Sequence, residues 1–389
     1  MKVTPVKITP VKITHVVENL ERGGLERVVV DLAGMQYRDG HDCEVVCLFG
    51  AGALASELRK QGIAVHACGK RAGLDLRALR RLRSLLAARR RGVIHTHNAT
   101  AHYHAAFALF GLKPDRLVNT RHGMGAADPG SRRERLYRLS MPLTHRVAAV
   151  CEAARDRFLA HGLHPRSGIE VVRNGIQVER FRPASVAARR QLASELGLPE
   201  GTRLIGTVGR LNVVKDQASL IQALLRMEPV SDDVALVIVG DGPLRGELER
   251  CARDAGITAR VRFLGDRSDV DRLLAGLDVF ALPSRSEGYS IALLEAAASA
   301  LPVVATDVGG SREIVHHGVT GELVPPGDVG ALAASLSRVL NDERASAGMR
   351  AAGRRWAMRE ASMQSMARRY MDFYGCTQPG EHQLDVLCG

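Results

Sequence analysis

Strand-like apolar runs alternate with helical patterns along most of this chain, and the alternation limits the folds it can adopt. One series begins with ITHVV at residues 13–17 and continues to VIHTHN at residues 93–98. A second begins with RLIGTVGRL at residues 203–211 and continues to PVVATD at residues 302–307. Such alternation is typical of βα units around a parallel sheet. We therefore predict an α/β fold of two doubly wound, Rossmann-like domains that bind ligand at the carboxyl ends of their strands.

Prolines and the length of each series define the expected domains. The tandem pentads KVTPV, KITPV and KITHV contain prolines that cannot donate to a β-ladder, so a central strand can begin only near Lys12. We expect a flexible extension over residues 1–11, an N-terminal domain over 12–183 and a C-terminal domain over 184–360.

Charge and composition restrict the possible partners and compartment. Residues 1–185 hold 31 Lys and Arg against 16 Asp and Glu, a net +15, while the remainder holds 23 against 26, a net −3. A basic half suits a membrane surface, a phosphate-bearing acceptor or nucleic acid, although an arginine-rich proteome gives the same excess. No apolar run reaches roughly 18 residues and no signal-peptide core is present, so we expect a cytoplasmic protein.

Two cations follow the first strand of the second series. The stretch GRLNVVKD places Arg210 and Lys215 five positions apart at the carboxyl edge of the predicted sheet. Arginine can hold phosphate oxygens bidentately and lysine adds a point charge, so the pair suits a diphosphate. The alternative is an exposed pair on a solvated turn.

Two glutamates frame the start of a predicted helix in EGYSIALLE, residues 287–295. The small residues Gly288 and Ser290 let backbone amides at the helix start approach a phosphate, which the helix dipole also favours. Glu287 lies in the preceding loop. Glu295 lies inside the helix, where a buried carboxylate would need a partner such as ribose hydroxyls. A glutamate in an amphipathic helix is otherwise simply exposed.

These loops and the motifs around them resemble one family. The motifs are GGLER at residues 23–27, IHTHN at 94–98, TRHG at 120–123, VVRNGIQVERFRP at 171–183 and VGDGPLRGELE at 239–249. Their order and spacing resemble those of the retaining glycosyltransferases of family 4, called glycosyl transferases group 1, which have the GT-B fold. The resemblance covers nearly the whole chain. It implies a helix at about 361–375 that returns to the first domain, followed by a tail at 376–389.

The resemblance implies a hexosyltransferase that uses a nucleotide-diphosphate sugar and no resident cofactor. Arg210 and Lys215 would hold the diphosphate, helped by the backbone amides of Gly288, Tyr289, Ser290 and Ile291. Glu287 would contact hydroxyls of the donor sugar, and Glu295 would accept hydrogen bonds from the ribose.

The same resemblance assigns the remaining site residues. His122 would face the sugar from the N-terminal domain, and Gly23 with Gly24 would form a loop that admits phosphate and acceptor. The base would lie near Arg267. The acceptor would be a saccharide or a polyprenyl-diphosphate-linked sugar, and the opening residues also resemble transferases of bacterial exopolysaccharide gene clusters. Two cations and a helix start stabilise a departing diphosphate, and no Asp-x-Asp element is evident in a plausible loop, so we predict metal independence.

Three alternatives come from other features. Gly240, Gly242 and Gly246, with Asp266 twenty residues further on, form a passable dinucleotide fingerprint and suggest an NAD-dependent enzyme. A nucleic-acid-binding protein would explain the basic half, but aromatic residues make up only 4% of the chain. The histidines of HTHNATAHYH, residues 95–104, are possible metal ligands, and we expect them instead in a polar loop that faces the acceptor.

A basic amphipathic segment suggests attachment to a membrane. The stretch LDLRALRRLRSLLAARRRG, residues 74–92, has leucines at near-helical spacing among seven arginines. The leucines are expected to pack on the sheet, which leaves the arginines for anionic headgroups. We therefore predict peripheral attachment to the inner face of a bacterial membrane.

Overall fold

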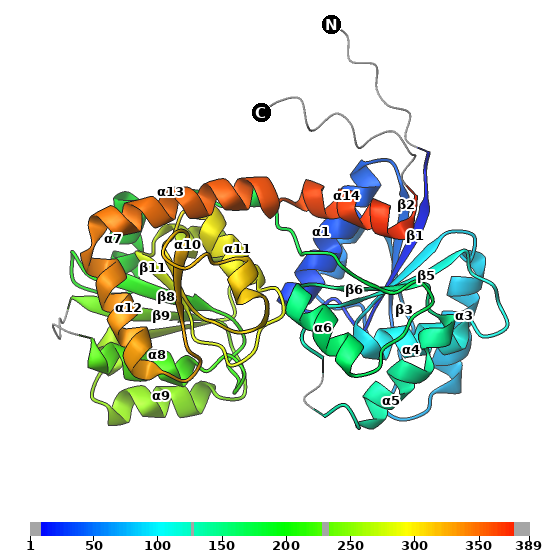
Figure 1. Ribbon diagram of the computed structural model, residues 1–389, viewed down its shortest axis with the longest axis horizontal. Coiled ribbons are helices and arrows are strands. Elements are labelled where there is room, and N and C mark those ends of the chain that lie inside the picture. Colours follow the sequence, from blue (N-terminus) through cyan, green and yellow to red (C-terminus); the bar gives the residue numbers. More distant parts are fainter. Residues whose placement is uncertain (1–8, 126–127, 228–232, 377–389) are drawn as a thin grey trace, which may run out of the picture. The chain divides into compact units, whose positions relative to one another are not determined.

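Seven parallel strands form one sheet, in the order β3-β2-β1-β4-β5-β6-β7 (Figure 1). The strands are β1 (Lys12–Val17), β2 (Asp42–Cys47), β3 (Ala64–Ala67), β4 (Val93–His97), β5 (Arg116–Arg121), β6 (Arg146–Ala149) and β7 (Ile169–Val171). The helices around them are α1 (Gly24–Arg38), α2 (Ala55–Lys60), α3 (Leu76–Ala88), α4 (Asn98–Ala108), α5 (Arg132–Leu139), η1 (Met141–Leu143), α6 (Glu152–Ala160) and α14 (Met363–Tyr374). The central strand begins at Lys12, as the prolines before it predict.

Six parallel strands form the other sheet, in the order β10-β9-β8-β11-β12-β13. They are β8 (Arg203–Val208), β9 (Val234–Val239), β10 (Val261–Gly265), β11 (Val279–Leu282), β12 (Val303–Thr306) and β13 (Gly321–Val324). The helices are η2 (Val178–Arg180), α7 (Val186–Glu195), α8 (Gln217–Arg226), α9 (Arg245–Asp254), η3 (Thr258–Arg260), α10 (Val270–Ala275), α11 (Ile291–Ala298), η4 (Gly309–Glu313), α12 (Val329–Asn341) and α13 (Glu343–Glu360). The predicted pair of doubly wound sheets is confirmed.

The two sheets belong to two separate units of this computed structural model, which describes residues 9–125, 128–227 and 233–376. Unit 1 comprises Met1–Asn174 and Met363–Gly389, and unit 2 comprises Gly175–Ser362. The boundary between the units lies after Asn174, whereas we expected it at Pro183. The Ile176 amide donates to the Ala361 carbonyl, which ties the chain after Asn174 to unit 2. Residues 1–8 of the expected extension and 377–389 of the expected tail lie outside the described residues.

Helices cover both faces of the unit 1 sheet, and its central strands β1 and β4 are buried on both sides. Consecutive residues of β1 show this: Val16 packs with α3 and α4, and Val17 packs with α1 and α2. The unit 2 sheet is similar, and all six residues of β9 are buried. Within the described residues, no helix is both long and apolar enough to span a bilayer.

Each strand order reverses beside its first strand. In unit 1 the chain moves outward from β1 to β2 and β3, then crosses back to β4 on the other side of β1. In unit 2 the same reversal separates β8 from β11. Ligands of doubly wound folds bind at the carboxyl ends of strands at this switch point, because the flanking loops diverge there.

The core of unit 1 contains buried histidines as well as apolar side chains. His102 on α4 lies between two hydroxyls, with Nδ1 2.7 Å from Thr96 Oγ1 and Nε2 2.7 Å from Thr144 Oγ1. Burial lowers the pKa of His102 to about 3 and that of His15 on β1 to about 4. These imidazoles are therefore neutral in the folded chain at neutral pH.

This neutrality predicts that acid destabilises unit 1. An unfolded histidine has a pKa near 6.5, so between that pH and about 4 the unfolded chain binds more protons and stability falls as pH falls. At pH 5 each such histidine lowers the free energy of unfolding by about 2 kcal/mol. In urea unfolding followed by circular dichroism, His102→Gln is expected to reduce the loss of stability between pH 7 and pH 5. The exposed-site control His164→Gln should match the wild type. An equal pH slope in His102→Gln would contradict this account.

Candidate functional site

Two loops meet at the switch point of unit 2. The loop after β8 carries Lys215, the loop after β11 carries Glu287, and Lys215 Nζ lies 2.6 Å from Glu287 Oε1. A backbone bond also joins the loops, because the amide of Arg285 donates to the Val214 carbonyl at 2.8 Å. Residues 72 positions apart in sequence are thus held in one polar cluster.

Glu287 is buried, with 7% of its surface exposed, so its carboxylate requires a charged or hydrogen-bonding partner. Lys215 provides that partner. Asn212 Oδ1 accepts from the Lys215 amide at 3.0 Å, which fixes the backbone from which the ammonium reaches Glu287. Removal of either partner would leave a charge that is poorly solvated.

Arg210 differs from Lys215 in being exposed and uncommitted. Among the described residues, none forms a hydrogen bond or an ion pair with its guanidinium. Its backbone carbonyl accepts a hydrogen bond from Gln217 Nε2 at 3.1 Å. The loop therefore presents one paired cation and one available cation.

Helix α11 begins at Ile291, four residues after Glu287. Ser290 is its N-cap and makes no side-chain capping bond, and the first amides of a helix have no intrahelical carbonyl partner. Tyr289 and Ser290 are buried, and the Gly288 carbonyl accepts from the Gly310 amide at 3.0 Å. Glu295 is half-buried on the second turn of this helix. The predicted helix start thus lies in the same loop as Glu287, and its contacts hold it against the loop after β12.

Arg267 lies in the loop after β10, where we expected the base. Its guanidinium binds Asp269 bidentately, with Nε to Oδ1 and Nη2 to Oδ2 both 2.8 Å. Asp269 and Asp271 form an Asp-x-Asp sequence at the start of α10, although no such element was expected in a plausible loop. Arg267 and Arg272 hold the pKa of Asp269 well below its usual range. Metal independence stays a prediction.

The glycines of the possible dinucleotide fingerprint have a different role. A Cβ on Gly240 would overlap the Gly209 carbonyl, and a Cβ on Gly242 would overlap that of Leu211. Backbone bonds connect the same loops, since the Leu211 amide donates to the Asp241 carbonyl at 3.0 Å. These glycines let the loop after β9 support the loop that carries Arg210, and the surface a pyrophosphate would need is occupied.

In unit 1, the loop before α1 holds the other predicted glycines. Gly23 is the extended N-cap of α1 and Gly24 is its first residue. The Glu26 carboxylate covers Gly23, where an added Cβ would meet it. Burial raises the pKa of Glu26, and the nearby Glu18 and Glu21 raise it further.

His122 follows β5 at the carboxyl edge of the unit 1 sheet. Its amide donates to Asn98 Oδ1 at 3.0 Å, and its Nε2 lies 2.9 Å from His97 Nδ1. Its Nδ1 is buried with no hydrogen-bond partner among the described residues. Burial lowers the pKa of His122 to about 3.

The histidines of HTHNATAHYH do not form a polar loop, so that expectation is wrong. His95 and His97 are buried on β4, and His102 is buried within α4. His95 and His97 share one face of β4, with ring centroids 4.2 Å apart. They lie beside His15 of β1, which no sequence motif singled out. One ring nitrogen of each of the three histidines lies within 4.8 Å of the others, close enough to hold a metal ion.

Comparison with known proteins identifies the family. The family model Glycosyltransferase Family 4 matches residues 22–180, and the model Glycosyl transferases group 1 matches residues 188–356. The chain belongs to the family 4 glycosyltransferases. Together the two matches cover β2 to β7 of the first sheet and all six strands of the second.

Curated relatives of this chain include two bacterial enzymes. The GDP-mannose-dependent alpha-(1-6)-phosphatidylinositol monomannoside mannosyltransferase of Mycobacterium tuberculosis is 34% identical over 238 residues, 58% of this chain and 60% of that protein. The N-acetyl-alpha-D-glucosaminyl L-malate synthase of Bacillus anthracis is 30% identical over 64% of this chain and 66% of that protein. The matched region thus spans less than two thirds of these relatives.

Solved structures confirm the GT-B fold. Anabaena Alr3699/HepE in complex with UDP has a TM-score of 0.82 at 24% identity, covering 94% of this chain and all of that one. A glycosyltransferase from Rickettsia africae has a TM-score of 0.80 at 20% identity, with 94% and 98% covered.

The loop packing predicts opposite effects for two glycines of the same motif. Gly242→Ala is expected to destabilise the chain by about 1–3 kcal/mol, because the new Cβ overlaps backbone that cannot move aside. Gly246→Ala should be neutral or stabilise by up to about 1 kcal/mol, because it lies on α9 with no atom closer than 3.9 Å. Urea unfolding of the two variants measures the difference. If Gly242→Ala and Gly246→Ala destabilise the chain equally, the result would favour the dinucleotide fingerprint, in which the last glycine, Gly246, also packs closely.

Proposed function

We propose that this chain is a retaining glycosyltransferase that moves a hexosyl unit from a nucleotide-diphosphate sugar to a saccharide or lipid-linked acceptor. Its setting would be the synthesis of a bacterial cell surface or exopolysaccharide. The reaction would need neither a metal ion nor a resident cofactor.

One observation carries the proposal: the Lys215–Glu287 pair lies beside the uncommitted Arg210 and the start of α11 at the switch point of unit 2. Two cations and free helix amides suit a diphosphate, whose negative charge increases as the sugar departs. The buried Glu287 carboxylate suits sugar hydroxyls, which can donate to it. Among the predicted site residues that the structure describes, these three features come together only here.

The relatives support a sugar-nucleotide donor without deciding its base. The M. tuberculosis relative is GDP-mannose-dependent, while HepE has been solved with UDP and with UDP-glucose. Both nucleotides share the diphosphate that Arg210 and Lys215 would hold. Base selection would fall to the loop around Arg267, whose guanidinium is already held by Asp269.

In the proposed reaction, the bond between the anomeric carbon and the diphosphate oxygen breaks as an acceptor hydroxyl bonds the same face of that carbon. The hydroxyl proton passes to the departing diphosphate, which Arg210 and Lys215 stabilise. Lys215 would then share its charge between Glu287 and phosphate. A nucleotide leaving group needs little protonation, so the two glutamates would not act as the acid and base of a glycoside hydrolase.

The two glutamates are expected to fail in different ways. Glu287→Ala should lower turnover by about a hundredfold or more, because the sugar loses its partner at the reacting carbon. It should leave nucleoside diphosphate binding intact, since Lys215 is then free for phosphate. Glu295→Ala should weaken nucleotide binding instead. Calorimetry with UDP and GDP, together with transfer assays, separates the two effects, and the exposed-site variant Glu247→Ala is the control.

A donor screen tests the class of enzyme. Thermal shift and sugar release would be measured with UDP-, GDP- and ADP-sugars and with NAD. Stabilisation and release with at least one sugar nucleotide are expected. Stabilisation by NAD alone, or wild-type kinetics in both glutamate variants, would refute the proposed site.

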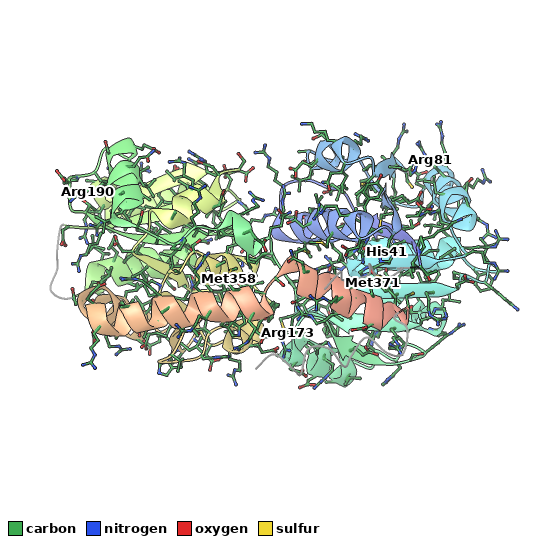
Figure 2. The ribbon with its side chains drawn as sticks, turned by 90° about the horizontal axis from the view of Figure 1, so that it is seen from above. His41, Arg81, Arg173, Arg190, Met358 and Met371 are labelled. Carbon is green, nitrogen blue, oxygen red and sulfur yellow. The ribbon has the colours of Figure 1, made fainter. Side chains whose placement is uncertain are left out.

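We also propose peripheral membrane attachment through α3. Ala78, Leu82 and Leu86 of this helix are buried against the sheet, while Arg77, Arg80 and Arg81 are exposed. Figure 2 shows Arg81 at the surface of the first unit. Contrary to the expected packing, Leu76 is 53% exposed, and Leu74 before the helix is 84% exposed. Exposed leucines beside arginines suit an anionic bilayer surface.

Liposome flotation tests this attachment. The chain should float with vesicles that contain anionic lipid and not with neutral ones, because each basic residue near the surface adds about 1 kcal/mol. Reversal of Arg77, Arg80 and Arg81 to glutamate should abolish flotation. The same reversal at Arg250, Arg253 and Arg355, exposed arginines of unit 2, should leave it unchanged. Absence from both kinds of vesicle would rule out the attachment.

A further inference from the structure

Four histidines lie in a row at the switch point of unit 1. His15 is on β1, His95 and His97 are on the adjacent β4, and His122 follows β5. The exposed fractions of His15, His95 and His97 are 0%, 0% and 1%. Buried polar rings at this density need a complete set of hydrogen bonds.

The direction of each hydrogen bond follows from one carbonyl. His15 Nε2 lies 2.9 Å from Gln36 Oε1, which can only accept, so Nε2 carries the proton and Nδ1 is an acceptor. His15 Nδ1 lies 3.0 Å from His97 Nε2, which must therefore be protonated. The remaining His97 Nδ1 then accepts from His122 Nε2 at 2.9 Å.

The other end of the Gln36 amide contacts Tyr374. Gln36 Nε2 donates to Tyr374 Oη at 3.3 Å, so that hydroxyl donates its own proton to His95 Nδ1 at 2.7 Å. His95 Nε2 then donates to Thr120 Oγ1 at 2.7 Å. Every donor meets an acceptor, and the C-terminal helix α14 provides the tyrosine on which the arrangement depends.

Burial supports the neutral form of these rings. It lowers the pKa of His15 to about 4 and of His122 to about 3, and it lowers the pKa of His95 and His97 well below the ordinary value. A neutral ring has one donor and one acceptor, so the donor and acceptor assignments above hold at neutral pH.

We infer that Gln36, His15 and His97 form a hydrogen-bond relay that fixes His122 in the Nε2-protonated tautomer and leaves its Nδ1 as an acceptor. Nδ1 is the ring atom without a partner among the described residues. A bare lone pair can bind a hydroxyl, which donates, and repels phosphate oxygens, which only accept. If the chain has the proposed function, His122 selects a hydroxyl of the sugar or acceptor. His97 and His15 are then positioning residues.

A metal ion is the competing explanation for three clustered histidines. It would need lone pairs from His15, His95 and His97 at once. His95 has both nitrogens bonded, to Tyr374 Oη and Thr120 Oγ1, and the facing nitrogens of His15 and His97 share a proton. The relay satisfies all of these atoms, whereas a metal would displace at least two of the bonds.

Nitrogen NMR on the full chain with ¹⁵N-labelled histidine reads the tautomer directly. Long-range proton–nitrogen spectra at pH 7 should show His122 protonated on Nε2 only, with the signal assigned by its loss in His122→Asn. In His97→Leu the acceptor is removed, and His122 should become a mixture of tautomers. In His97→Asn the amide oxygen replaces Nδ1, and the single tautomer should return.

Three outcomes would overturn the relay. They are an Nδ1-protonated His122 in the wild type, a His122 spectrum unchanged by His97→Leu, and one equivalent of transition metal bound to the purified chain. None of these readings depends on a donor sugar, so they are independent of the proposed function.

Kinetics with a donor from the screen test the role of His122. His97→Leu should lower kcat for transfer about 10-fold to 100-fold, the usual cost of losing a residue that orients a functional group. The affinity for nucleoside diphosphate should stay within about twofold, since those contacts lie in unit 2, and His97→Asn should restore most of kcat. If His97→Leu gives the expected spectra but an unchanged kcat, the relay is supported and the contact between His122 and the sugar is refuted.

Discussion

Backbone pairing between parallel strands determines where this protein can bind anything. Each strand must be followed by a crossover to its parallel neighbour, and such crossovers are right-handed. When the strand order reverses beside β1 and beside β8, consecutive crossovers leave in opposite directions and their loops separate. The carboxyl ends of β1 and β4, and of β8 and β11, are therefore the natural positions for ligand-binding side chains.

The two switch points hold polar clusters of opposite character. In unit 2 the cluster is charged: a buried carboxylate is paired with Lys215, and Arg210 remains available. In unit 1 the cluster is neutral, because burial keeps four imidazoles uncharged, and hydrogen bonds link three of them, His15, His97 and His122, in series. A charged cluster suits an anionic diphosphate, and a neutral one suits hydroxyl groups. The same topology thus provides two polar clusters with different chemistry.

Much of the unit 2 site could be predicted from sequence because its residues lie in short loops at the ends of recognisable strands. GRLNVVKD and EGYSIALLE each follow a strand, and parallel strands end at one edge of the sheet. The structure adds the pairing of Lys215 with Glu287. The glycines of VGDGPLRG were ambiguous, because a phosphate loop and a tightly packed loop both require glycine. Only the position of the neighbouring Leu211 carbonyl distinguishes them.

Sequence by itself determined the two doubly wound sheets and the family, because alternation, motif order and spacing are properties of the chain read from end to end. Tertiary structure alone decided the histidine cluster. His15 is one polar residue in an apolar strand, and HTHN looks like a polar loop, until strand register sets His15 opposite His95. It also brought Tyr374 from α14 to His95, 279 positions earlier. Hydrogen-bond direction depends on which atoms face each other, and that arises only when distant segments pack together.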